Sequence, residues 1–114
     1  MNAPATLPNA DRALLYIAKL RDYCLNPQHP DGRHKARVFK ASLSLGRDDT
    51  EWLGSTLLAG VRAAALIGQE TTSFGTRYAV DIVVETNGRR AIVRTGWIVR
   101  IGQDTPRFVT CFVL

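Results

Sequence analysis

The chain has 114 residues and a formal net charge of +5, with 46% hydrophobic and 22% charged residues. This length supports one compact domain with a single hydrophobic core, and this composition excludes a disordered chain. No apolar stretch reaches the roughly 18–20 residues that a membrane span needs, and the N-terminus lacks a secretory pattern. We therefore expect a cytoplasmic protein without a membrane partner.

Basic residues are concentrated in two segments. Residues 29–47 contain five Lys or Arg and one acidic residue, and residues 89–107 contain the same numbers. These segments hold a charge of +8, and the rest of the chain holds −3. A local positive field of this kind suits a polyanion such as RNA, and ordinary solvated surface charge is the alternative.

The first thirteen residues are expected to form a flexible arm, because they contain two prolines and little to pack. A single domain is expected over residues 14–114. Ile17, Leu20 and either Tyr23 or Cys24 form one helical stripe. This helix ends before Pro27, because the residue before a proline is pushed out of the α region.

Two further helices are predicted. One begins at Arg33 and ends at Gly46, with these side chains towards the core: Val38, Phe39, Ser42 and Leu45. The other begins at a capping box of Asp48 and Glu51 and carries an apolar stripe at Leu53, Leu57, Val61 and Ala64.

Alternating residues from 77 to 84 then predict a strand. Asn87 and Gly88 follow, and this pair favours a type I′ hairpin turn because both central residues need positive φ. Further strands are predicted at residues 91–101 and 107–113. The predicted fold is α+β, with two to three N-terminal helices packed on one face of a C-terminal antiparallel β-meander.

The hairpin turn predicts the register of the first two strands. If Thr86 faces Arg89, then Asp81 faces Arg94 on the open face of the sheet. The opposite face is continuous apolar surface, which the helices must cover.

A five-residue second turn would place Thr110 beside Ile98 and in line with Arg77 on the open face. Arg100 is expected on the same face, where guanidinium groups can donate paired hydrogen bonds to phosphates. The alternative is that these arginines are solvated.

Aromatic residues and cysteines are assigned to the core. Trp52, Trp97 and Tyr78 lie on apolar stripes rather than on a surface for base stacking. Cys24 and Cys111 lack the spacing of a metal site, so we interpret them as reduced core residues without a disulfide.

Five segments together resemble a bacterial domain family with no assigned function: LPNADRA, LRDYCLNPQHPDGRHKARVF, FGTRYAVDI, GWIVRIG and PRFVTCFVL. The resemblance covers residues 7–114, and its most specific block is HPDGRHKARVF. The family is in turn similar, more weakly, to the Barnase–EndoU–colicin–RelE group of small metal-independent ribonuclease toxins. The resemblance implies helices on one face of an antiparallel sheet and RNA on the other.

The resemblance also implies site residues. Toxins of that group use a His near the N-terminal helices, basic residues that hold the scissile phosphate, and often a Thr or Ser on the last strand. The matching positions are His34 or His29, then Lys35 and Arg77, then Thr110. This sequence departs from the pattern because it has no evident catalytic Glu on the open face.

Metal-free RNA cleavage needs a base for the 2′-hydroxyl, an acid for the departing 5′-oxygen, and donors to the phosphorane. Histidine suits this task because the unperturbed imidazole titrates near neutrality. His34 also follows the start of a helix, where free N–H groups favour an anion. The candidates for substrate contact are Arg33, Arg37, Arg94 and Arg100. The alternative is that the Pro30–Gly32 bend is only a turn and that both histidines are surface residues.

The sequence therefore favours a metal-independent endoribonuclease toxin with no cofactor, acting on RNA and controlled by an antitoxin or immunity protein. The alternative function is a non-catalytic module that binds nucleic acid or another protein, including a second copy of the chain. The outer edge of the last strand offers one surface for such pairing.

Overall fold

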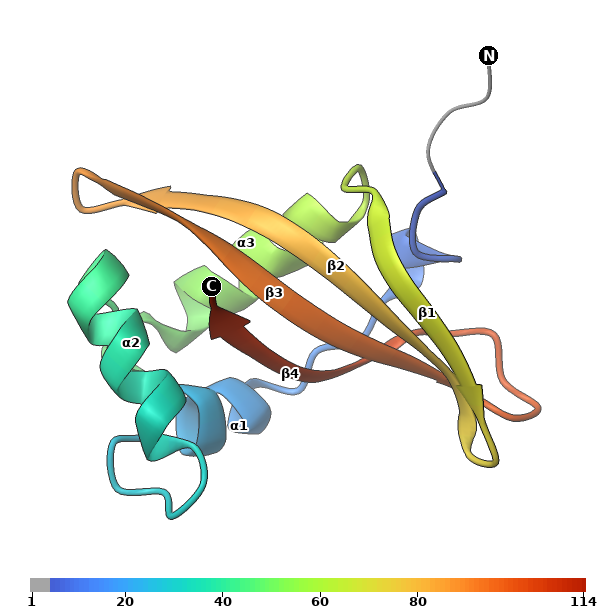
Figure 1. Ribbon diagram of the computed structural model, residues 1–114, viewed down its shortest axis with the longest axis horizontal. Coiled ribbons are helices and arrows are strands. Elements are labelled where there is room, and N and C mark those ends of the chain that lie inside the picture. Colours follow the sequence, from blue (N-terminus) through green and yellow to red (C-terminus); the bar gives the residue numbers. More distant parts are fainter. Residues whose placement is uncertain (1–4) are drawn as a thin grey trace.

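The computed structural model describes residues 5–114 and has the predicted α+β architecture (Figure 1). Short helices precede a four-stranded antiparallel sheet with the strand order β1-β2-β3-β4. The elements are η1 (Ala10–Arg12), α1 (Ile17–Lys19), η2 (Leu20–Cys24), α2 (Arg33–Leu43), η3 (Arg47–Asp49), α3 (Thr50–Val61), β1 (Leu66–Thr72), β2 (Gly75–Thr86), β3 (Arg89–Arg100) and β4 (Arg107–Val113). Within the described residues, no helix is long and apolar enough to cross a membrane.

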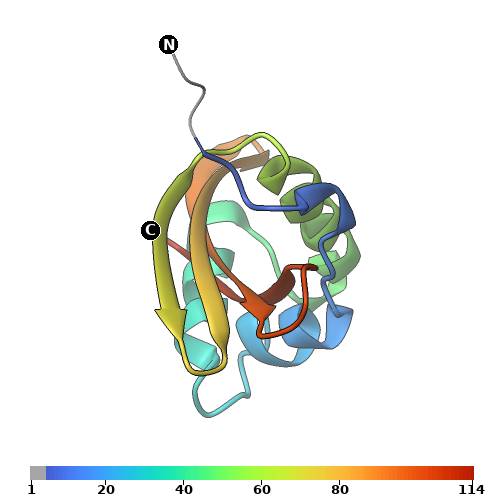
Figure 2. The same ribbon diagram turned by 90° about the vertical axis from the view of Figure 1, so that its right-hand side faces the viewer.

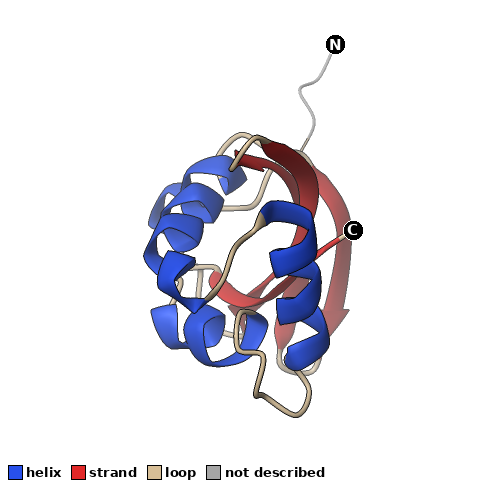
Figure 3. Ribbon diagram, turned by 90° about the vertical axis from the view of Figure 1, so that its left-hand side faces the viewer, coloured by secondary structure: helices blue, strands red, loops and turns tan. Residues whose placement is uncertain are grey.

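The helices lie together on one side of a strongly twisted sheet (Figures 2 and 3). The core between these two layers contains Trp97, Phe39 and Phe108 as its largest fully or almost fully buried side chains. The ring of Trp97 meets that of Phe108 edge to face at 5.4 Å, a favoured geometry for aromatic pairs. The prediction that helices cover a single apolar face of the sheet is confirmed.

The predicted hairpin between β2 and β3 is also confirmed. Asn87 and Gly88 have φ values of 54° and 71°, as the type I′ turn requires. Thr86 pairs with Arg89, and the register continues unbroken along both strands.

The prediction of three strands was wrong by one, because β1 precedes the predicted meander. Its sequence, LIGQETT, has no alternation of apolar and polar residues, and most of its side chains are exposed. An edge strand that buries neither face is held by its backbone hydrogen bonds to β2, and such bonds leave no trace in the hydrophobic pattern.

The predicted register of the last strand was also wrong. Thr110 pairs with Gly96 rather than Ile98, because the pairing of β4 with β3 begins with Arg107 opposite Ile98, so the connection is longer than the predicted five-residue turn. A bulge between Gly96 and Trp97 leaves Val109 without a partner of its own and moves Thr110 back by one position, from Thr95 to Gly96. Thr110 therefore lies in line with Gly96 and not with Arg77.

Helix α2 ends earlier than predicted. Ser44, rather than Gly46, adopts the left-handed conformation, with a φ of 57°. The N–H groups of Ser44 and Leu45 donate to the carbonyls of Lys40 and Phe39, which closes the last turn and directs Leu45 into the core.

The start of the third helix differs too. The N–H of Gly46 donates to the Asp49 carboxylate at 2.9 Å, so the capping interaction lies two residues earlier than the predicted pair of Asp48 and Glu51. Trp52, predicted to lie in the core, is 43% exposed on α3, whereas Leu53 and Leu57 are buried. The indole lies beside the apolar stripe of the helix rather than on it.

The predicted arm at residues 1–13 falls partly outside the described residues. From residue 5 onwards, the chain packs against the domain. Leu7 and Ala10 belong to the core, and Thr6 forms a bridge with Ala65. Core packing therefore begins before the predicted boundary at Leu14.

The tip of the β2–β3 hairpin holds the C-terminus of α2. The Asn87 side-chain amide donates to the Leu43 carbonyl at 2.9 Å, and the Arg89 guanidinium donates to the Ala41 carbonyl at 2.8 Å. These bonds satisfy carbonyls that have no partner within the helix. They also determine where the opposite end of α2 meets the rest of the domain.

One polar side chain is buried at the centre of the sheet. The Thr95 hydroxyl donates to the Val80 carbonyl at 2.7 Å and accepts from the Trp97 indole N–H at 2.8 Å. Thr95 therefore provides the hydrogen bond that a buried indole N–H requires.

We predict that Thr95→Val lowers the free energy of unfolding by about 1–3 kcal/mol, because the Trp97 indole N–H then has no acceptor. Urea unfolding followed by Trp fluorescence measures this change. Thr76→Val is the matched control, because that strand hydroxyl makes only a 3.4 Å contact with the exposed Thr71. An equal loss in both variants would contradict the prediction.

Candidate active site

Two adjoining open hollows lie at the edge of β4, where α2 and η2 meet the sheet. One has a volume of about 430 Å³ and is lined by Lys19, Tyr23, Lys35, Val109 and Thr110. The other has a volume of about 370 Å³ and is lined by His34, Lys35, Val38, Thr110, Phe112 and Val113. Lys35 and Thr110 belong to both, so three of the predicted catalytic residues, His34, Lys35 and Thr110, surround one continuous surface.

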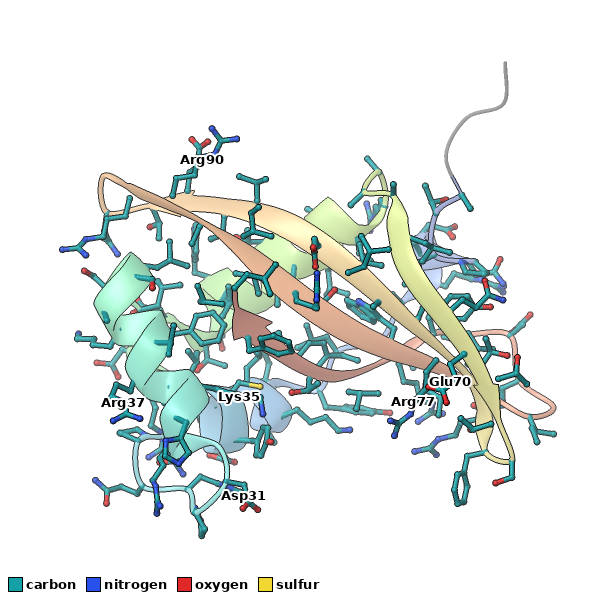
Figure 4. All side chains as sticks on the ribbon, in the orientation of Figure 1. Asp31, Lys35, Arg37, Glu70, Arg77 and Arg90 are labelled. Atoms are coloured by element: carbon teal, nitrogen blue, oxygen red, sulfur yellow. The ribbon has the colours of Figure 1, made fainter. Side chains whose placement is uncertain are left out.

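Lys35 is held over Tyr23. Its ammonium donates to the phenol oxygen at 2.9 Å and lies 4.9 Å from the centre of the aromatic ring. Both contacts orient a cation that Figure 4 shows between α2 and the end of the first helical segment. The ammonium keeps further donors for an anion, since a lysine has three.

His34 is exposed at the first turn of α2, and its ring is tied to Arg37. The Arg37 guanidinium lies 2.9 Å from Nδ1 of His34. Arginine can only donate a hydrogen bond, so Nδ1 is the acceptor and the neutral ring carries its proton on Nε2. In this arrangement His34 presents a donor, and Arg37 must leave before Nδ1 can take a proton.

His29 holds the loop that precedes α2. Its Nδ1 accepts from the N–H groups of Asp31 and Gly32 at 3.0 and 2.9 Å, and its carbonyl accepts from the N–H of Arg33. Its ring also meets that of Tyr23 edge to face at 4.8 Å. The N–H groups of Gly32 and Arg33 are therefore occupied, and His29 does not line either hollow.

Gly32 allows this loop to approach η2. A Cβ atom at residue 32 would lie 2.1 Å from the backbone oxygen of Tyr23. Its φ of −80° is open to any residue, so the requirement for glycine comes from this contact and not from backbone strain. The bend that the sequence indicated at Pro30–Gly32 is thus a packing contact that brings α2 against Tyr23.

Other predicted residues lie away from the hollows. Arg77 is on β2 opposite Glu70, and Figure 4 shows it well apart from Lys35. Arg100 lies at the end of β3, paired with Gly75, and lines neither hollow. Arg33, exposed at the start of α2, does not line them either.

Arg94 has a partner of its own. It donates to both oxygens of Asp81, at 2.9 and 3.1 Å, as the predicted register of these two strands requires. This hydrogen bond to Asp81 raises the pKa of the Arg94 guanidinium. An anion would have to compete with a bidentate carboxylate, so Arg94 is poorly placed to bind phosphate.

No carboxylate is among the residues that line the two hollows. The neighbouring acid on η2, Asp22, lies between Arg21 and Arg47, with oxygen–nitrogen distances of 2.9 and 3.0 Å. Hydrogen bonding from Arg21, followed by Arg47, lowers the pKa of Asp22 to about 2. The hollows thus combine Lys19, Lys35 and His34 without a neutralising acid.

Two lining residues, Lys19 and Tyr23, were missed in the sequence. Tyr23 was assigned to a core stripe, and its ring does pack against the core while its hydroxyl reaches Lys35. The signal that could have found them is their i, i+4 spacing, which places two side chains on one helical face.

A larger groove of about 730 Å³ lies on the other side of α2. Apolar residues including Leu25, Ala36 and Leu45 line it, with Arg37 and Lys40 among the charged ones. It contains none of the predicted catalytic residues, and its only candidate for substrate contact is Arg37. Within residues 5–114, no group of three His, Cys, Asp or Glu side chains could hold a metal ion.

Residues 6–114 match the profile of a family described as "Domain of unknown function (DUF6883)". The chain belongs to this family. The resemblance to a domain family without an assigned function is thereby confirmed. The comparison with curated proteins gives no match.

A solved structure shares the fold. It is one chain of a "Contact-dependent growth inhibition toxin - immunity protein complex" from Klebsiella pneumoniae 342. The two chains superpose with a TM-score of 0.69 at 10% sequence identity, over 88% of this chain and 98% of the other. At this identity the likeness establishes the common fold.

We predict that Gly32→Ala lowers the free energy of unfolding by about 2 kcal/mol, because the new methyl group must displace the Tyr23 backbone. Chemical denaturation measures the loss. Gly46→Ala is the matched control, since a Cβ there meets nothing within 4 Å and its φ of −134° suits alanine. A Gly32→Ala variant as stable as Gly46→Ala would show that this contact does not position α2.

Proposed function

We propose that this protein is a metal-independent endoribonuclease of the toxin type. The observation that carries the proposal is that His34, Lys35 and Thr110 line one of two adjoining cationic hollows, while Tyr23 and Lys19 line the other together with Lys35 and Thr110. The net charge of +5 supports an RNA substrate, and the fold shared with a chain of a toxin–immunity complex supports the toxin class.

The proposed reaction is attack of a ribose 2′-oxygen on the adjacent phosphorus. The 2′-hydroxyl loses its proton, the bond from phosphorus to the 5′-oxygen breaks, and the products carry a 2′,3′-cyclic phosphate and a 5′-hydroxyl. Lys35 would stabilise the negative charge of the phosphorane, because a positioned cation acts most strongly where charge develops. The Thr110 hydroxyl would donate to the same oxygens.

His34 would act as the base once substrate has bound. A phosphate is a stronger acceptor for Arg37 than a neutral imidazole, so the guanidinium would move from His34 to the substrate. Nδ1 would then be free to take the 2′-hydroxyl proton. Tyr23, hydrogen-bonded to Lys35, is the candidate donor to the departing 5′-oxygen.

A cognate partner is part of the proposal. The structural neighbour comes from a complex of a toxin with an immunity protein, and we assign the toxin-like role to this chain because its hollow suits a polyanion. An antitoxin or immunity protein with an acidic surface would complement the charge of the hollow and exclude RNA.

The second candidate function is a non-catalytic module that binds nucleic acid or protein. Two observations favour it: the hollows lack a carboxylate, and the His34 ring is engaged by Arg37. Such a module would bind RNA through the same cations and leave it intact.

The purified protein should cleave RNA in the presence of EDTA and leave 2′,3′-cyclic phosphate ends, because the proposed chemistry uses side chains alone. Electrophoresis of an end-labelled RNA, with mass analysis of the ends, measures this. RNA that stays intact at a molar excess of protein, while binding to it, would favour the module.

His34→Ala should lower the rate of cleavage by ~10²-fold or more, the scale of a lost general base, and weaken RNA binding only slightly. Single-turnover cleavage and filter binding separate the two effects. Lys40→Ala is the matched control, because it removes a side chain from the other side of α2. Full cleavage by His34→Ala would exclude this histidine as the base.

A further inference from the structure

Three arginines gather on the open face of the sheet, at the end where β3 stops and β4 begins. Arg77 on β2 and Arg107 on β4 are the two pairing partners of Ile98, one on each side of it. Residues that pair across antiparallel strands point to the same face, so both arginine side chains flank that of Ile98. Arg100 follows two positions after Ile98 on β3 and therefore points to this face as well. We call Arg77, Arg100 and Arg107 the sheet-end arginines.

Arg107 holds a hydrogen-bond donor that the chain does not use. Its Nε is buried, and no atom within residues 5–114 accepts a hydrogen bond from it. Backbone pairing on both sides fixes Arg107, since it pairs with Ile98 on β3 and forms a parallel bridge with Leu14. Native proteins leave few buried donors unpaired, because an unpaired donor lowers stability. The unused Nε–H therefore points to an acceptor that comes from outside the chain.

The sheet-end arginines also lack carboxylate partners. None of them forms an ion pair with a described carboxylate, whereas Arg94 on the same face is bound by Asp81. The acid of this row is Glu70, which pairs with Arg77 across β1 and β2 without an ion pair, and Figure 4 shows both at this end of the sheet. Three guanidinium groups thus face one carboxylate, and the excess positive charge suits an oxyanion.

We propose that Arg77 and Arg107 together bind one phosphate group of the RNA backbone, with the Arg107 Nε–H among the donors. Neighbouring strands lie about 4.8 Å apart, so the two Cα atoms on either side of Ile98 are about 10 Å apart. Two extended arginine side chains can close on one phosphate across this gap, and the planar guanidinium matches paired phosphate oxygens. RNA as the source of the phosphate rests on the proposed function, whereas the phosphate site itself does not.

The phosphate site lies next to the hollows along the same face. Thr110 pairs with Gly96, which precedes Ile98 by two positions on β3, and Gly96 pairs with Ala79 on its other side. No bulky side chain of this row therefore stands between Thr110 and the sheet-end arginines. A single RNA strand could place one phosphate at the hollows and a neighbouring one at Arg77 and Arg107.

The first test uses inorganic phosphate and needs no RNA. The arginine Nε–H signals of the isotope-labelled full chain are followed by NMR while phosphate replaces chloride at constant ionic strength. We expect the Arg107 signal to shift and saturate, because its free donor gains an acceptor. The Arg94 signal should stay in place, since that Nε–H already donates to Asp81 at 2.9 Å. An unmoved Arg107 signal, or an equal shift of both signals, would overturn the site.

Acetate at the same concentrations distinguishes a phosphate site from a carboxylate site. We expect a weaker response of the Arg107 signal, because the carboxylate carries less charge and offers fewer acceptor oxygens. A response to acetate as strong as that to phosphate would show that the site is not specific for phosphate and would contradict the proposal.

The second test measures binding of an RNA oligonucleotide with a 2′-O-methyl group on every ribose. The proposed chemistry cannot cleave it, so binding is measured whether or not the protein is a ribonuclease. Arg107→Lys keeps the charge and removes the Nε–H, and we expect about 10-fold weaker binding or more. Arg90→Lys is the matched control, because Arg90 is exposed at the opposite end of the sheet beside Glu85 (Figure 4).

The outcomes separate this inference from the proposed function. Tight RNA binding that Arg107→Lys leaves unchanged, or that Arg90→Lys weakens equally, would overturn the phosphate site alone. A wild-type protein that binds phosphate at Arg107 and no RNA would overturn RNA as the ligand, and the proposed function with it.

A charge variant covers the case in which Arg107→Lys does not fold. Arg77 is exposed, so Arg77→Gln removes one cation without disturbing the core. Binding of the same RNA over a range of salt concentrations should show the slope of log K against log salt reduced by about 0.7, the value for one lost phosphate contact to a single strand. An unchanged slope would exclude Arg77 from the site.

Discussion

The candidate site depends on the close contact of Gly32 with the backbone of Tyr23. A side chain at residue 32 would overlap the Tyr23 carbonyl, so the start of α2 can reach η2 only with glycine at this position. That contact brings Lys35 within hydrogen-bonding distance of the Tyr23 phenol and turns His34 towards the edge of β4. At its other end α2 is held by the hairpin tip, so both ends of the helix are anchored.

The charges of the domain divide into two groups with different consequences. Arg94 is neutralised by Asp81 on the open face of the sheet, and Arg21 and Arg47 are neutralised by Asp22. The cations that line the hollows have no carboxylate among them. A phosphate near the hollows therefore meets unscreened positive charge, whereas the paired arginines would first have to release a carboxylate.

The hollow and the hydrophobic core are parts of one structure. Tyr23 and Thr110 line one of the two hollows, and the residues after each of them, Cys24 and Cys111, are buried in the core. Residues that follow one another on a strand point to opposite faces, so Thr110 and Cys111 connect the two environments directly.

Local patterns in the sequence determined the α+β class, the Asn87–Gly88 turn and the pairing of Asp81 with Arg94, because each follows from period, turn chemistry or register over a few neighbouring residues. The candidacy of Lys35, His34 and Thr110 was also visible, although it came from a resemblance. Only the tertiary structure decided the rest. The long connection between β3 and β4, after which Arg107 pairs with Ile98, moved Thr110 out of line with Arg77, and long-range backbone pairing added β1, which has no hydrophobic signature. In the structure, His29 holds the loop before α2, and Lys19 and Tyr23 line one of the hollows. The sequence did not predict these positions, because they depend on contacts between distant segments, which the residue spacing within one segment does not encode.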